Sequence, residues 1–279
     1  MPTAIGEPVE LVAPDGTLLS GSVAAGGERT AVLMHGLTAH RGLVLMGSRK
    51  LQREGWTVIA FDARGHGNSG PAAPGSDYGY GRLIEDAEAI LARFAPGPAV
   101  LVGVSMGAHT AAGLAIARPD LCRAMVLITP AWRGSTVLSP TEAERWLGLA
   151  DALESDGIEG FIGELAESGP QGRWSELASV AARQRMGSHL HLDAVAAALR
   201  DTPLSKPFQS LDSLQSLRLP TLVVGSRDEA DPGHPVAVAQ DWAQRIPGAR
   251  FELEGEGESP LAWRGASIAD FALSLAEGP

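Results

Sequence analysis

The chain has 279 residues, of which 44% are hydrophobic and 20% are charged, which excludes a disordered or collagen-like protein and suffices for one sizeable core. Its 22 Lys and Arg residues stand against 33 Asp and Glu residues, and the net charge of −11 argues against nucleic acid or an anionic membrane as a partner. The single cysteine, Cys122, excludes an internal disulfide.

The opening segment, MPTAIGEPVELVAPDG, has neither the basic region nor the apolar stretch of a secretion signal. No later apolar run reaches the roughly 18 residues needed to cross a bilayer. We therefore expect a soluble, cytoplasmic protein that does not bind a membrane.

Short apolar runs alternate with longer amphipathic stretches along most of the chain. Residues 9–23 are typical of a hairpin that turns at Asp15-Gly16. Runs rich in Val, Ile and Leu predict buried strands over Ala31–Met34, Thr57–Phe61, Val100–Val104, Met125–Ile128 and Thr221–Val224, and Arg250–Leu253 is expected to be the last strand. Apolar spacings of three and four predict helices over Leu43–Glu54, Arg82–Phe94, Ala108–Arg118 and Val236–Arg245. This alternation predicts an α/β fold, with a mostly parallel sheet covered by helices on both faces.

The alternation stops between about Trp132 and Leu219, where the pattern is helical. Helices are predicted over Pro140–Leu153, Ile158–Glu167, Trp174–Met186 and Leu192–Asp201. We therefore expect a core formed by residues 1–131 and 219–279, and a helical lid formed by residues 132–218. Open α/β sheets bind ligands at the carboxyl ends of their strands, and a lid would cover that edge. Surface helices without a role are the alternative.

The sharpest chemical motif is Gly103-Val104-Ser105-Met106-Gly107, which follows an apolar run and precedes a helical stretch. A serine on a tight strand-to-helix turn needs small residues two positions to either side, and the two glycines supply that room. The helix that begins at Met106 would direct backbone N–H groups at an oxyanion beside Ser105. The motif therefore predicts a nucleophilic serine.

Two further motifs follow predicted strands. His35-Gly36-Leu37 could turn so that the Leu37 N–H faces Ser105 as a second oxyanion donor, and Asp62-Ala63-Arg64-Gly65-His66-Gly67-Asn68-Ser69 follows the next strand. Taken together and in this order, the motifs resemble the α/β-hydrolase family across nearly the whole chain. The resemblance implies the α/β-hydrolase fold, an oxyanion hole at Leu37 and Met106, and a late acid and base.

The acid of the family is matched after the strand Thr221–Val224. The segment Gly225-Ser226-Arg227-Asp228-Glu229-Ala230-Asp231-Pro232 is similar to the family's G-x-x-D-x-x-x-P loop, so Asp228 matches the carboxylate that orients the catalytic imidazole. Asp231 is the competitor. Either aspartate could instead cap a helix or pair with the adjacent Arg227.

The base departs from the family pattern. After Arg250–Leu253 the chain reads Gly255-Glu256-Gly257-Glu258-Ser259-Pro260, so Glu258 stands where the family has histidine, and no histidine follows His234. Three outcomes stay open. His234 replaces the missing imidazole, Glu258 is itself the base with a pKa raised by burial and by Asp228, or the protein has no base. For His234, the alternative role is that of a residue at the start of a helix, before Pro235.

The other chemistry-bearing residues have structural interpretations. We expect His35 and His66 to be architectural, His109 to pack against a neighbouring loop, and Cys122 to be a buried structural thiol. Solvated histidines are expected at His40, His189 and His191. Lid tryptophans, which either wall an apolar pocket or anchor the helices, are Trp132, Trp146 and Trp174. The sequence has no nucleotide-binding or metal-binding motif, so no cofactor is expected.

The function that these residues predict is a serine hydrolase for a small, largely apolar carboxylic ester, lactone or thioester. Ser105 is the nucleophile, Asp228 orients the base, His234 or Glu258 is the base, and the partner is a small-molecule substrate. The competing hypothesis is a hydrolase-fold protein without hydrolytic activity, which binds a ligand or acts as a lyase or isomerase in the same pocket. The oligomeric state is not indicated by the sequence.

Overall fold

The computed structural model describes residues 6–134, 138–168, 173–227, 233–255 and 265–276. Its centre is an eight-stranded sheet in the order β1-β2-β4-β3-β5-β6-β7-β8. The strands are β1 (Glu7–Val12), β2 (Leu18–Ala24), β3 (Thr30–Met34), β4 (Thr57–Phe61), β5 (Ala99–Val104), β6 (Cys122–Ile128), β7 (Thr221–Gly225) and β8 (Arg250–Leu253). The pairs β1–β2 and β2–β4 are antiparallel, and all the others are parallel. The predicted hairpin and strands are confirmed.

Helices cover both faces of this sheet because alternate strand residues point to opposite sides. The helices of the core are α1 (Lys50–Arg53), α2 (Tyr80–Phe94), α3 (Met106–Ala117), α7 (Val236–Arg245) and α8 (Gly265–Ala276). On β5, Leu101 packs into the apolar layer under α2, α3 and α7, whereas Val100 and Val102 pack into the layer under α1 and α8. Strands buried on both faces explain the nearly continuous apolar runs in the sequence.

One predicted helix of the core is wrong. Of the segment Leu43–Glu54 only α1 is helical, and it follows a short 3-10 turn, η1 (Arg41–Leu43), and a further turn. Met46 and Gly47 have φ values of 45° and 79°, which end any right-handed helix there. The apolar spacing has another cause, since Val44 and Leu45 are buried against the sheet from a turn.

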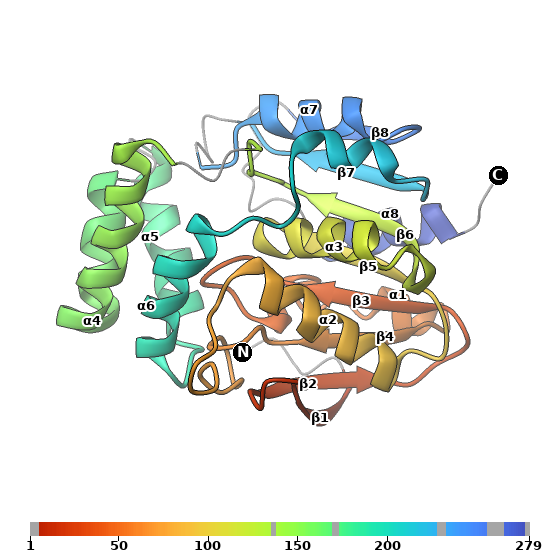
Figure 1. The fold of residues 1–279 in the computed structure, drawn as a ribbon, viewed down its shortest axis with the longest axis horizontal. Helices are drawn as coiled ribbons and strands as arrows, with labels where there is room; N and C mark the ends of the chain where they lie inside the picture. The colour runs from red at the N-terminus through yellow and green to blue at the C-terminus, as the bar shows by residue number, and fades with distance from the viewer. Residues whose placement is uncertain (1–5, 135–137, 169–172, 228–232, 256–264, 277–279) are drawn as a thin grey trace.

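The chain between β6 and β7 is helical. Its helices are α4 (Pro140–Ser168), α5 (Arg173–Met186), α6 (Leu192–Asp201) and two 3-10 turns, η3 (Thr202–Leu204) and η4 (Leu211–Ser216). Gly157, with a φ of 63°, interrupts α4 where the sequence predicts a break between two helices. In Figure 1 the helices α4, α5 and α6 lie beyond one end of the sheet, and the arrows of β3 and β6 point toward them. Within the described ranges, no helix has both the length and the apolar character that a bilayer span requires.

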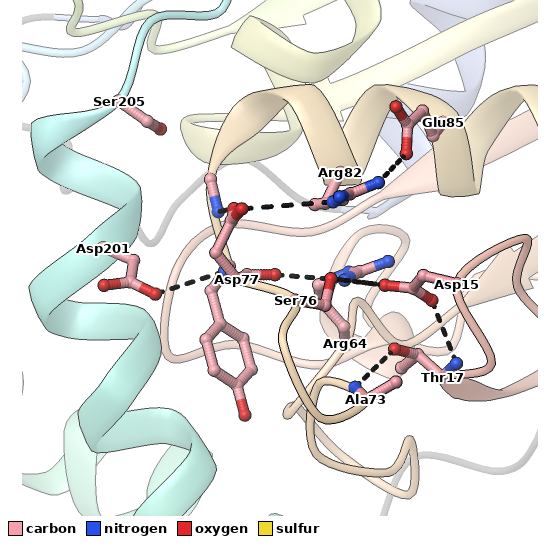
Figure 2. Close-up of polar contacts among 12 residues, drawn as sticks. Asp15, Thr17, Arg64, Ala73, Ser76, Asp77, Arg82, Glu85, Asp201 and Ser205 are labelled. Atoms are coloured by element: carbon pink, nitrogen blue, oxygen red, sulfur yellow. Dashed lines mark hydrogen bonds and ion pairs between the residues drawn. The ribbon is translucent and has the colours of Figure 1, made fainter.

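The loop between β4 and α2, residues 62–79, makes polar contacts with this helical insertion and with the rest of the core (Figure 2). The Tyr78 amide donates to Asp201 at 3.3 Å. At the start of α2, the Tyr80 amide donates to the Ser205 hydroxyl at 3.0 Å. On the other side of the loop, the Arg64 guanidinium is 1% exposed and pairs with Asp15 of the hairpin turn and with Asp86 of α2, both at 2.7 Å. The same loop therefore contacts the hairpin, α2 and the insertion.

Candidate active site

Ser105 lies between β5 and α3, where the chain turns sharply. Its φ and ψ are 51° and −111°, a strained conformation for a residue with a side chain. A Cβ on Gly107 would overlap the Met34 carbonyl of β3, and a Cβ on Gly103 would overlap the backbone at Gly107. The two glycines that the motif requires therefore have a steric reason. Ser105 is only partly buried.

His234 contacts this serine. The His234 Nε2 atom lies 2.8 Å from the Ser105 Oγ atom, although 129 residues separate them in the sequence. His234 comes from the segment after β7, directly before Pro235 and α7, whereas the family pattern expects a base after β8. At this distance the hydroxyl can donate to the imidazole, which is the geometry that a general base requires.

The backbone amides of Leu37 and Met106 are the two candidate donors of an oxyanion hole. The Met106 amide is the first of α3, and the Leu37 amide lies in the loop after β3. Within the part of the chain that the structure describes, neither amide donates to a protein acceptor. Both Leu37 and Met106 pack with Tyr80 and Leu83 in one apolar cluster, so the loop and the elbow are neighbours in space.

Three buried histidines surround the loop after β3. The amide of Ala63 donates to His35 Nε2 at 2.9 Å, and the amide of Thr38 donates to His66 Nε2 at 3.3 Å. Each ring then donates its Nδ1–H to a carbonyl, of Gly36 for His35 and of Arg64 for His66. The pKa of each of these two rings is lowered from 6.5 to about 3, mainly by burial. The architectural role predicted for both is confirmed.

The third ring, His189, corrects a prediction. It was expected to be solvated, but it is only 9% exposed. Its ring and the His66 ring are arranged edge to face, with their centroids 5.5 Å apart. The sequence offers no signal for this, because His189 lies in the insertion, 122 residues after its hydrogen-bond partner Gly67. Of the other two histidines predicted as solvated, His40 is partly buried and accepts from the Gly42 amide at 3.2 Å, and His191 is also partly exposed.

His109 packs against the neighbouring loop, as predicted. Its Nε2 accepts from the amides of Ala131 and Trp132 at 2.9 and 3.1 Å, so the proton resides on Nδ1, which donates to the Tyr80 hydroxyl at 2.6 Å. Burial is the largest cause that lowers its pKa from 6.5 to about 3. The ring is therefore a neutral support that connects α2 and α3 with the start of the insertion.

The tryptophans near the insertion have mixed outcomes. Trp132 is buried, contacts the Phe208 ring edge-on at 4.7 Å, and accepts at its carbonyl from the Trp242 indole at 2.9 Å. This anchors the loop to α7. Trp146 packs against the apolar cluster inside the insertion. The side chain of Trp174 lies outside the described residues.

Three candidate carboxylates also lie outside the described residues: Asp228, Asp231 and Glu258. A fourth, Glu254, which the sequence reasoning did not consider, is 2% exposed directly after β8. Its carboxylate accepts from the Arg227 amide at 3.1 Å, which fixes the chain one residue before Asp228. Among the described residues, no group of three or more His, Cys, Asp or Glu side chains is arranged to hold a metal ion.

An apolar cavity lies behind the elbow, between the sheet and the helices α2 and α3. Its lining includes Leu33, Phe61, Leu83, Met106 and Gly107, whereas Ser105 and His234 do not line it. The contact between Ser105 and His234 therefore lies outside this cavity.

This fold and this arrangement define a class of protein. The family model of the alpha/beta hydrolase fold matches residues 32–200, which is more than half of the chain. The chain therefore belongs to the alpha/beta hydrolase fold family.

Particular proteins are similar to this chain in sequence or in structure. The sn-1-specific diacylglycerol lipase ABHD11 of Mus musculus is 36% identical over 106 residues, which cover 38% of this chain and 34% of the lipase. The chain thus matches about a third of that protein's length. A thermophilic esterase from Thermogutta terrifontis superposes with a TM-score of 0.77 at 22% identity, covering 98% of this chain and 97% of the esterase. The enol-lactonase of Burkholderia xenovorans gives a TM-score of 0.74 at 21% identity, covering 96% and 98% of the two chains. At these identities, the two structures show a shared fold.

Proposed function

We propose that the protein is a serine hydrolase that cleaves a small, largely apolar carboxylic ester, lactone or thioester. The observation that carries this proposal is the 2.8 Å contact between Ser105 Oγ and His234 Nε2, at a strained turn in front of a helix N-terminus. The esterase and enol-lactonase activities named for the two similar structures agree with this class of reaction.

The reaction would begin as Ser105 Oγ bonds to the acyl carbon and its proton passes to His234 Nε2. The carbonyl electron pair moves to oxygen, and the amides of Leu37 and Met106 donate to this oxyanion. As the carbonyl forms again, the bond to the leaving oxygen or sulfur breaks, and His234 returns the proton to the leaving group. Water then attacks the acyl-serine with His234 as base, and the carboxylic acid and free Ser105 result.

His234 is favoured over Glu258 as the base on chemical grounds. A neutral imidazole within hydrogen-bond reach of the serine matches the proton transfer near neutral pH, whereas a glutamate needs a strongly raised pKa to do so. We assign Asp228 as the group that orients His234, since it follows Arg227 in the segment that leads to His234.

The helical insertion would act as a lid, with residues 132–218 covering the carboxyl ends of the strands. The Leu37 side chain packs against an apolar cluster of the insertion that includes Leu149 of α4 and Val195 of α6. The insertion therefore lies against the loop that would carry one oxyanion donor.

The test is labelling with a fluorophosphonate probe together with turnover of a panel of short nitrophenyl esters. We expect Ser105→Ala to abolish labelling, and Ser105→Ala and His234→Ala each to lower kcat by at least about 10³-fold. His191→Ala is the matched control, because it removes a partly exposed histidine at the start of α6 and should leave kcat unchanged.

Glu258→Gln decides between the two bases. If it abolishes turnover while His234→Ala does not, Glu258 is the base and the role of His234 is refuted. If the wild-type protein neither reacts with the probe nor cleaves any ester, the hydrolase proposal is rejected in favour of ligand binding or of lyase or isomerase chemistry.

A further inference from the structure

The loop after β3 holds a strained residue next to one proposed oxyanion donor. Thr38, which follows Leu37, has a φ of 63°, a left-handed conformation that a β-branched residue rarely adopts. The Ala39 amide donates to the Gly36 carbonyl at 3.0 Å and closes the turn around it. Because such a conformation persists only when its surroundings fix it, the direction of the Leu37 amide depends on what holds Thr38.

Two histidines from different parts of the fold hold Thr38 by its backbone. On one side, its amide donates to His66 Nε2 at 3.3 Å. On the other side, its carbonyl accepts from His189 Nε2 at 3.0 Å. His66 belongs to the loop after β4, whereas His189 precedes α6 in the helical insertion. The insertion thus contributes a direct hydrogen bond to the loop after β3.

The partners of His189 determine which nitrogen carries its proton. The Gly67 amide donates to His189 Nδ1 at 2.7 Å, so Nδ1 is unprotonated and the hydrogen lies on Nε2, directed at Thr38. The next residue, Leu190, donates its own amide to the Gly67 carbonyl at 2.9 Å, which fixes the backbone on which the ring is mounted. Burial is the largest of the causes that lower the pKa of His189, which favours the neutral ring that this pair of bonds requires.

We propose that His189 is a positioning residue for catalysis, through which the helical insertion holds the oxyanion loop in its working conformation. Its Nε2–H fixes the Thr38 carbonyl and so the direction of the preceding Leu37 amide. This inference rests on the proposed function, because it assigns a purpose to the Leu37 amide. It also means that the insertion does more than cover the site, since the oxyanion hole is complete only when the insertion is docked.

Two substitutions separate the two hydrogen bonds of the ring. In His189→Gln, the amide nitrogen of glutamine can stand in for Nε2 and donate to Thr38, while the acceptor for Gly67 is lost. In His189→Asn, the amide oxygen of asparagine can stand in for Nδ1 and accept from Gly67, while the donor to Thr38 is lost. The neighbouring Leu190→Ala, which removes a side chain that is 68% exposed, is the control.

We expect His189→Asn to lower kcat for a nitrophenyl ester by about 10- to 100-fold with KM within about threefold of the wild-type value. His189→Gln and Leu190→Ala should stay within about threefold in both constants. A merely structural role would instead make both His189 variants equal, or make His189→Gln the worse one, and either result overturns the proposal.

Amide hydrogen exchange of the peptide that contains residues 35–40, read by mass spectrometry, gives a measurement that is independent of activity. His189→Asn should speed its exchange by about tenfold or more, and His189→Gln should not. If the wild-type protein cleaves no ester, the proposed function fails, and the exchange experiment still decides whether His189 holds the loop. Equal exchange in the wild type and in His189→Asn refutes that role, whatever the activity.

Discussion

Lowering the pH from 7 to 5 is expected to reduce the free energy of unfolding by about 6 kcal/mol, because three buried histidines must stay neutral in the folded protein. The pKa values of His35, His66 and His109 are each lowered from 6.5 to about 3. Between these values the unfolded chain binds protons that the folded chain does not. The stability is therefore present above pH 6.5 and is lost as the pH falls, by about 1.4 kcal/mol per pH unit for each ring.

This loss amounts to about 2 kcal/mol per histidine between pH 7 and 5, and the total is comparable with the 5 to 15 kcal/mol by which domains are stable. Two further histidines, His40 and His189, also have lowered pKa values and act in the same direction. The pKa of Asp86 is raised above its ordinary value, mainly by burial, and this acts in the opposite direction. The loss from the histidines therefore dominates in this pH range.

Urea unfolding followed by tryptophan fluorescence at pH 7, 6 and 5, at constant ionic strength, measures the effect. The variant His109→Gln should lose about a third of the three-ring slope, whatever its stability at pH 7. A free energy of unfolding that changes by less than about 2 kcal/mol from pH 7 to 5 would contradict the reasoning. An unchanged slope in the variant would exclude His109 as one of the responsible groups.

Three further predictions concern the elbow, the buried ion pairs and the thiol. Gly107→Ala should lower both probe labelling and thermal stability, because its Cβ has no room beside β3. In the control Gly81→Ala in α2, the new Cβ meets nothing within 4 Å, so the substitution should raise the free energy of unfolding by up to about 1 kcal/mol. Equal melting temperatures for the two variants would contradict this. Arg64→Met should lower the free energy of unfolding in urea by about 3 to 5 kcal/mol, because it leaves two largely buried carboxylates without their partner. The control Arg82→Met breaks only exposed pairs and should change the free energy of unfolding by less than about 1 kcal/mol. Similar losses in the two variants would refute the argument. Burial raises the pKa of Cys122 to about 12, so the thiol of the folded protein should resist a disulfide reagent at pH 8 and react once urea unfolds the chain. Rapid reaction of Cys122 in the folded protein would show that the thiol is accessible.

Local patterns were sufficient for most of the elements. The bounds of β4, β8, α6 and α7 agree with the prediction to the residue, because strand and helix periods and their turn residues are read from neighbours in the chain. The failure at Leu43–Glu54 has the same origin, since apolar spacing reports burial and cannot distinguish a buried turn from a helix. Asp228 and Glu258 stay predictions, because they lie outside the described residues.

The sequence by itself determined where a nucleophile could stand. A serine flanked by glycines between a strand and a helix is a pattern of neighbouring residues, and the steric reason for Gly103 is local, because a Cβ there would overlap the backbone at Gly107. The reason for Gly107 comes from the sheet, because a Cβ there would overlap the Met34 carbonyl of β3. Whether His234, Glu258 or no residue acts on that serine was open, and only the tertiary structure placed His234 against Ser105. The same holds for His189, which only the docking of the insertion brings to the loop after β3. Contacts between residues more than a hundred positions apart depend on how the sheet and the insertion pack, and no local pattern encodes that distance.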